Sequence, residues 1–138
     1  MRRVVLVPDP RVRLEAAAGA LAAAGLEAVV ATGLADARRL VEGGALGVVI
    51  GVPEGGWVGE EPATLASWPT GVRRRCVVAL AGPGLLTGDG VRAFLLGVDL
   101  LVSAGDLGKL GEIMACALQT KGALLAPLDP AAAARFGA

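Results

Sequence analysis

Five short apolar runs recur along the chain. They lie at residues 4–7, 27–31, 46–52, 76–81 and 99–103. Most of them are continuous in valine, leucine, isoleucine or alanine and do not alternate with polar residues, which is typical of strands covered on both faces. Proline or glycine follows several of the runs and marks the ends of these strands.

The segments between the runs have the spacing of amphipathic helices. Helices are predicted at residues 11–24, 34–42, 89–97 and 106–121, with a short helical turn at 63–67. In the first helix, Val12, Ala16 and Ala20 recur on one stripe, and Gly25 lies where a capping glycine ends a helix.

This alternation of strands and helices predicts an α/β fold. Right-handed crossovers make the strands parallel and place helices on both faces of the sheet. We expect a flavodoxin-like, five-stranded parallel sheet with the strand order 2-1-3-4-5. Residues 1–122 are predicted to form one domain, and residues 123–138, rich in proline and alanine, a loosely packed tail.

Composition and charge favour a cytoplasmic protein. Of 138 residues, 54% are hydrophobic, yet no apolar run reaches the roughly 18 residues of a membrane-spanning helix. The 13 basic residues balance 13 acidic ones, which argues against nucleic acid or a membrane surface as a partner. Cys76 and Cys116 are predicted to be reduced and buried.

Few residues of the chain suit catalysis. Histidine is absent, which removes imidazole bases and histidine metal ligands. Ligands of doubly wound sheets bind beyond the carboxyl ends of the strands, but Pro8 and Pro10 remove backbone donors from the first of these loops. No glycine-rich phosphate loop follows the first strand. We predict no catalytic residue, no metal and no cofactor, and therefore no enzyme.

Three segments carry a resemblance to a known family. Residues 4–10 (VVLVPDP) resemble the first strand and acidic turn of the receiver domains of bacterial response regulators. Residues 46–54 (LGVVIGVPE) resemble the phosphoacceptor strand, and residues 99–107 (DLLVSAGDL) the fifth strand as it enters the last helix. The similarity covers residues 3–121 and implies a receiver fold and a role in bacterial signal transduction.

Receiver chemistry implies groups that this chain lacks. Receivers hold Mg²⁺ with two acids after the first strand and an aspartate on the third, and bind the phosphoryl oxygens with a hydroxyl and a lysine. Asp9 alone keeps a carboxylate. Gly51 replaces the phosphoacceptor, Ala81 the hydroxyl and Ser103 the lysine. The resemblance thus implies a degenerate receiver, and Asp9 is expected to cap a helix or lie in solvent.

Surfaces remain as the candidate functional features. Receivers commonly bind partners through the fourth helix, the fifth strand and the last helix, and this region is nearly free of charge here. Small residues along the last helix permit close approach of either the domain's own neighbouring helix or a partner. The residues of this possible interaction face are Val91, Phe94, Leu95, Gly108, Gly111 and Ala115.

A basic run precedes the fourth strand. Arg73, Arg74 and Arg75 are interpreted either as solvated residues or as a contact for an acidic or phosphate-rich partner. Nucleic acid is not expected, because only 3% of the residues are aromatic and no stacking platform accompanies the arginines.

The leading hypothesis is a phosphorylation-incompetent, receiver-like module that binds a protein partner or a second copy in bacterial signalling or cell organisation. The alternative is a sensor that binds a small ligand in a strand-end pocket around Asp9, Gly51 and Gly82. Both hypotheses place function in binding and not in catalysis.

Overall fold

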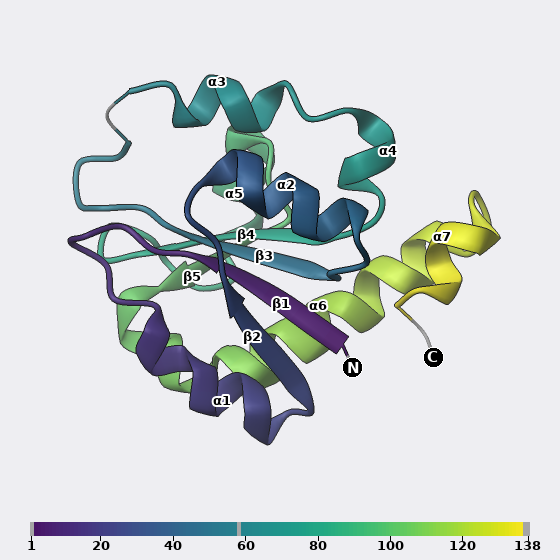
Figure 1. Ribbon diagram of the computed structural model, residues 1–138, viewed down its shortest axis with the longest axis horizontal. Coiled ribbons are helices and arrows are strands. Elements are labelled where there is room, and N and C mark those ends of the chain that lie inside the picture. The colour runs from purple at the N-terminus through teal and green to yellow at the C-terminus, as the bar shows by residue number, and fades with distance from the viewer. Residues whose placement is uncertain (1, 58, 137–138) are drawn as a thin grey trace.

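A five-stranded parallel sheet forms the centre of the molecule (Figure 1). The computed structural model describes residues 2–57 and 59–136. The strand order β2-β1-β3-β4-β5 confirms the predicted order and the flavodoxin-like α/β fold. The strands are β1 (Arg2–Val7), β2 (Leu26–Val30), β3 (Gly47–Gly51), β4 (Val77–Gly82) and β5 (Leu100–Ser103).

Every residue of the two central strands β3 and β4 is buried. Successive side chains point to opposite faces, so that Val48 and Ile50 enter one core while Val49 enters the other. The continuous apolar runs of the sequence are explained by this burial on both faces, because neither face of the central strands meets water.

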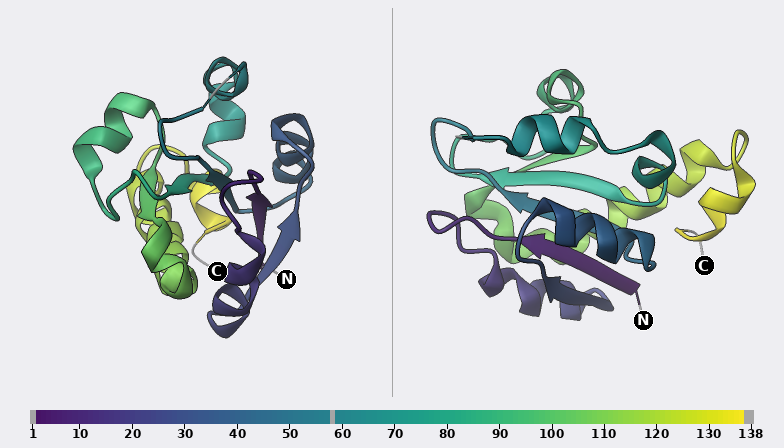
Figure 2. Two further views of the ribbon diagram at one scale, coloured as in Figure 1. Left: turned by 90° about the vertical axis from the view of Figure 1, so that its left-hand side faces the viewer. Right: turned by 45° about the horizontal axis from the view of Figure 1, so that its top comes forward.

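Helices cover the two faces of the sheet (Figures 1 and 2). One layer contains α2 (Leu34–Glu42), α3 (Glu61–Ala66), α4 (Thr70–Arg73) and α5 (Gly90–Leu96). The other contains α1 (Ala18–Ala23) and α6 (Leu110–Leu125), which follow the 3₁₀ turns η1 (Glu15–Ala17) and η2 (Ala104–Lys109). Helix α7 (Pro130–Ala134) folds back beside the end of α6. None of the helices in the described ranges is both long and apolar enough to cross a bilayer.

The first helix begins later than its spacing predicts. Residues 8–14 form a loop, and helical structure starts at Glu15 instead of residue 11. The carboxylate of Asp9 accepts a hydrogen bond from the backbone N–H of Arg11, and the carbonyl oxygen of Asp9 accepts one from Val12. This local turn competes with the first turn of a helix, as aspartate side chains commonly do. The sequence pattern also missed α4, because Pro69 and Gly71 suggest a loop there.

The carboxyl-terminal segment is packed against the domain and differs in this from the predicted loose tail. Helix α6 continues to Leu125, and Asp129 caps α7 by accepting a hydrogen bond from the N–H of Ala132. Phe136 is only 2% exposed and lies in the same core as α1 and α6. Burial of this aromatic side chain helps to hold the segment against the domain.

The small-residue stripe of the last helix is explained within the chain at Gly111. A Cβ atom at Gly111 would collide with the carbonyl oxygen of Ala20 in α1 and lie 3.0 Å from the Cβ atom of Ala24. Gly111 is therefore not part of an exposed interaction face, which corrects that assignment. Gly108 is exposed and Ala115 half-buried, so the stripe does not form one continuous exposed surface.

Substitution of Gly111 tests this contact. Gly111→Leu should lower the free energy of unfolding by at least about 2 kcal/mol, because α1 and α6 must separate to admit the side chain. Urea denaturation monitored by circular dichroism measures the change. Gly108→Ala is the matched control, since a Cβ atom there meets nothing within 4 Å. Equal stability of Gly111→Leu and the wild type would contradict the close approach.

Candidate functional site

The register of the sheet brings Asp9, Gly51, Ala81 and Ser103, the four positions of the receiver comparison, to the side of the sheet where the strands have their carboxyl ends. Gly51 pairs with Ala81, and Gly82 pairs with Ser103. Val7 pairs with Ile50, which places Asp9 two residues beyond the end of β1 on the same side. Strand ends that are far apart in the sequence therefore lie on the same side of the sheet, as they do in any parallel sheet.

Gly51, the position where the resemblance implies a phosphoacceptor, is covered by the neighbouring loop. A Cβ atom at Gly51 would lie 3.1 Å from the backbone nitrogen of Asp9 and 3.2 Å from Cβ of Val12. Val12 is only 4% exposed and packs in the core beneath this edge. An aspartate side chain at Gly51 would require the loop of residues 8–14 to move.

In the described part of the chain, Gly51 and Gly82 leave little space for the small ligand expected around Asp9, Gly51 and Gly82. Val12 covers Gly51, and a Cβ atom at Gly82 would collide with the carbonyl oxygen of Val52. Side chain and backbone fill the space where that ligand would lie, so the glycines serve close packing of the chain.

Asp9 uses its carboxylate for its own loop. Its Oδ1 atom accepts hydrogen bonds from the backbone N–H of Arg11 at 2.8 Å and from Nε of the same arginine at 3.4 Å. The expected capping role is thus fulfilled for a turn instead of for a helix. A cation at Asp9 would have to compete with the Arg11 guanidinium.

Ser103 belongs to a hydrogen-bond network at the end of β5. The hydroxyl of Thr87 accepts a hydrogen bond from the backbone N–H of Ser103 at 2.8 Å and donates one to Asp106 at 2.6 Å. The hydroxyl of Ser103 accepts a hydrogen bond from the N–H of Gly105 and caps η2. These hydrogen bonds hold the loop before α5 against strand β5. The hydroxyl groups of Thr87 and Ser103 are therefore used to stabilise the local structure.

Strand β5 forms one edge of the sheet, and helix α5 beside it carries strongly exposed apolar side chains. Val91, Phe94 and Leu95 of α5 are 75%, 82% and 75% exposed. Ala93 packs into the core, so α5 turns one side inward and leaves this apolar side in solvent. The prediction that these three residues lie on an exposed face fits their positions.

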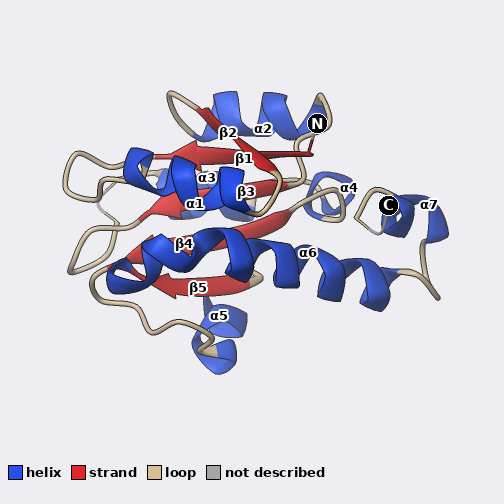
Figure 3. Ribbon diagram, turned by 90° about the horizontal axis from the view of Figure 1, so that it is seen from below, coloured by secondary structure: helices blue, strands red, loops and turns tan. Residues whose placement is uncertain are grey.

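An apolar groove lies at the same edge, lined by residues of β5 and α6. Figure 3 shows where these two elements lie in the fold. Its volume is about 660 Å³. Leu100 of β5 forms one side, and Ile113, Cys116 and Leu124 of α6 form the other. Cys116 is exposed, which corrects its expected burial. We define the β5-edge surface as this groove together with Val91, Phe94 and Leu95.

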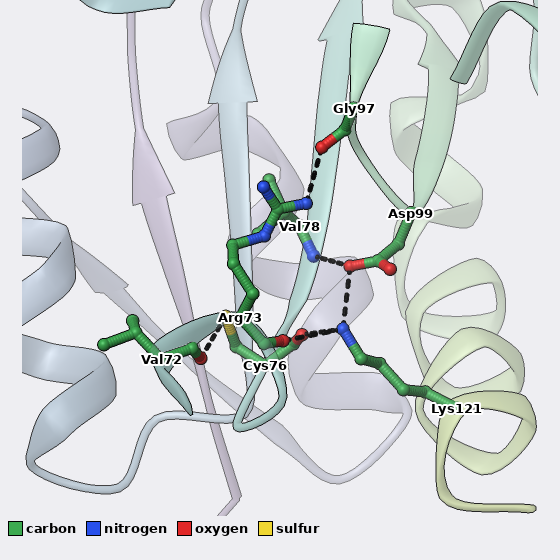
Figure 4. Close-up of polar contacts among 7 residues, drawn as sticks. All are labelled: Val72, Arg73, Cys76, Val78, Gly97, Asp99 and Lys121. Carbon is green, nitrogen blue, oxygen red and sulfur yellow. Dashed lines mark hydrogen bonds and ion pairs between the residues drawn. The ribbon is translucent and has the colours of Figure 1, made fainter. Parts of the chain in front are cut away.

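The three consecutive arginines, Arg73, Arg74 and Arg75, lie in different surroundings and do not form one basic surface. Arg73 donates a hydrogen bond to the carbonyl oxygen of Gly97 at 2.6 Å (Figure 4). Arg74 forms an ion pair of 3.6 Å with Asp129, and Arg75 is half-buried. Because Arg73 turns inward beneath α5, the three residues do not present a common surface to an acidic partner.

Lys121 connects α6 to the start of the fourth strand (Figure 4). Its ammonium group donates hydrogen bonds to the carbonyl oxygens of Arg73 and Cys76, at 2.8 and 2.6 Å, and to the carboxylate of Asp99 at 3.1 Å. Asp99 also accepts a hydrogen bond from the backbone N–H of Val78 at 2.8 Å. Sequence reasoning missed this cluster, for which a lone lysine in an apolar helix is the only signal.

The thiol of Cys76 lies beside this cluster without contact to solvent. Burial raises its pKa from the ordinary value of 9.0 to about 11, and the charges of Lys121, Asp99 and Arg73 alter that effect only secondarily. The thiol is neutral at pH 7 and donates a long hydrogen bond to the carbonyl oxygen of Val72. A neutral, enclosed thiol is unsuited to nucleophilic chemistry.

Comparison with known proteins finds no matching family model and no matching curated protein.

Because the loop of residues 8–14 covers Gly51, we predict that introducing an aspartate at this position does not enable the protein to accept a phosphoryl group. Neither the wild type nor Gly51→Asp should gain the mass of a phosphoryl group after incubation with acetyl phosphate and Mg²⁺. The new carboxylate would lack room, and the partner groups would still be absent. Intact-mass spectrometry measures the outcome. A phosphoryl adduct on the wild type that disappears in Asp9→Ala would contradict the prediction.

Burial of Cys76 predicts a dependence of stability on alkaline pH. Below about pH 9 the thiol keeps its proton in the folded and unfolded states, so its contribution is fully present. Between pH 9 and 11 the unfolded chain loses the proton first, and the free energy of unfolding falls. The loss should approach about 3 kcal/mol above the folded-state pKa.

Urea titrations of the wild type and Cys76→Ala across this pH range isolate the effect. The difference in unfolding free energy between the two proteins should shrink as the pH rises. Cys116→Ala serves as the control, because its thiol is exposed and its removal should leave the pH profile unchanged. A constant difference between wild type and Cys76→Ala would show that the thiol is not buried as described.

Proposed function

We infer that the chain is a phosphorylation-incompetent, receiver-like module that works in bacterial signalling or cell organisation by binding protein and not by catalysis. The flavodoxin-like strand order supports the receiver-like part, together with the meeting of Asp9, Gly51, Ala81 and Ser103 at one edge. The covered acceptor position supports the loss of phosphorylation.

The β5-edge surface is the observation that carries the proposal. It joins strongly exposed apolar side chains on α5 with an apolar groove along α6. Strongly exposed apolar side chains and an apolar groove at one edge of a small domain favour a site of association. Phe94 suits the centre of such a contact, because buried aromatic residues contribute most strongly to protein interfaces.

A second copy of the chain is the partner that this surface fits. Phe94 and Leu95 project from α5, whereas the neighbouring groove is concave and apolar. A two-fold axis lets the projecting side chains of each copy enter the groove of the other, since a two-fold contact pairs a surface with itself. The formal charge of the chain is zero, so long-range repulsion between copies is weak.

Sedimentation velocity over a concentration series tests the association. The wild type should pass from monomer to dimer with a dissociation constant of about 10 µM or below. Val91→Glu and Phe94→Glu should each weaken the dimer by about tenfold or more, because each would bury an unpaired charge. Modification of Cys116 by a thiol reagent should slow as the dimer forms, since this residue lines the groove.

Val30→Glu is the matched control. Val30 is 54% exposed but lies on β2, at the opposite edge of the sheet. This variant should dimerise like the wild type. A wild-type chain that remains monomeric at about 100 µM, or a dimer that Val30→Glu weakens as much as Val91→Glu does, would exclude self-association through the β5-edge surface.

A further inference from the structure

A second cavity, separate from the β5-edge surface, lies between α3, α4 and α5 over the middle of β4. Its volume is about 240 Å³. Leu65, Leu80 and Leu85 line it with buried apolar side chains, and the half-buried ring of Trp57 closes one side. Two further lining residues are cationic, Arg73 and Arg92, and we call this cavity the arginine pocket.

Neither guanidinium of the arginine pocket has an acidic partner. Within the described part of the chain, no carboxylate lies at ion-pair distance from Arg73 or Arg92. Arg92 donates to the carbonyl oxygen of Gly84 at 3.0 Å, and Arg73 to that of Gly97 at 2.6 Å. Nε of Arg73 is buried and lacks a hydrogen-bond partner among the described residues.

This arrangement is costly without a ligand. A buried donor that lacks a partner, such as Nε of Arg73, carries its full desolvation penalty, and the exposed Arg92 adds a second positive charge beside the same cavity. Both costs fall if an anion enters the cavity, because guanidinium groups form strong, charge-assisted hydrogen bonds with carboxylates. The lining of apolar side chains with a few polar groups is also the usual composition of small-molecule sites.

We propose that the arginine pocket binds a small organic acid with an aromatic or branched apolar body, its carboxylate paired with Arg73 and Arg92. A dry cavity of about 150 Å³ accepts benzene, so 240 Å³ accommodates roughly ten non-hydrogen atoms. The apolar body packs on the leucines and on the Trp57 ring. Inorganic phosphate supplies the charge but leaves the apolar lining uncovered.

Titrations followed by ¹H–¹⁵N spectra test the site with defined probes. Benzoate and 3-phenylpropanoate should bind with dissociation constants of about 1 mM or below, and neutral benzamide and inorganic phosphate should each bind about tenfold or more weakly. The indole N–H of Trp57 should shift on saturation, whereas that of Trp68, which does not line the pocket, serves as an internal reference.

Variants separate a built site from general attraction to a basic surface. Arg73→Gln and Arg92→Gln should each weaken benzoate binding about tenfold or more, and Arg38→Gln, on the exposed side of α2, should leave it unchanged. Because Arg73 also holds the end of α5, the exposed Arg92 gives the decisive comparison.

Three outcomes would overturn the proposal. They are the absence of a saturable Trp57 shift at millimolar benzoate, equal binding of benzoate and benzamide, and equal weakening by Arg92→Gln and Arg38→Gln. Dimerisation through the β5-edge surface is measured independently, so its failure would leave this result intact.

Discussion

Burial of the central strands on both faces is the constraint from which the rest of the structure follows. β3 and β4 have no exposed residue, so every side chain along them has to pack between two helical layers. Polar and reactive groups are thereby confined to strand ends and to the sheet edge. Helices α1 and α6 of one layer approach closely enough that glycine is required at Gly111, and the loop of residues 8–14 encloses Gly51 tightly.

The carboxyl ends of the strands are filled by the chain itself. Val12 covers Gly51, Asp9 is bound by its own loop, and Ser103 caps a 3₁₀ turn. Each group that remains at this edge satisfies a local backbone donor or fills a local space. These local contacts contribute to the stability of the loops at the strand ends.

Helix α5 links the two surfaces on which binding is proposed. Its outer side exposes Val91, Phe94 and Leu95, while Arg92 and its carboxyl-terminal glycine line the arginine pocket. The helix is short and packs inward mainly through Ala93, so the other side chains of α5 make few core contacts. Residues that contribute little to the core are free to differ in chemistry without affecting the sheet.

The sequence by itself determined the fold class and favoured the observed strand order, because continuous apolar runs and helical spacing are local properties and their alternation implies a doubly wound parallel sheet. Only the tertiary structure decided that Gly111 packs on α1, that Phe136 orders the carboxyl-terminal segment and that Arg73 turns inward while Arg74 pairs with Asp129. These contacts join residues far apart in the chain. Their geometry depends on how elements distant in the sequence pack beside each other, which no local pattern records.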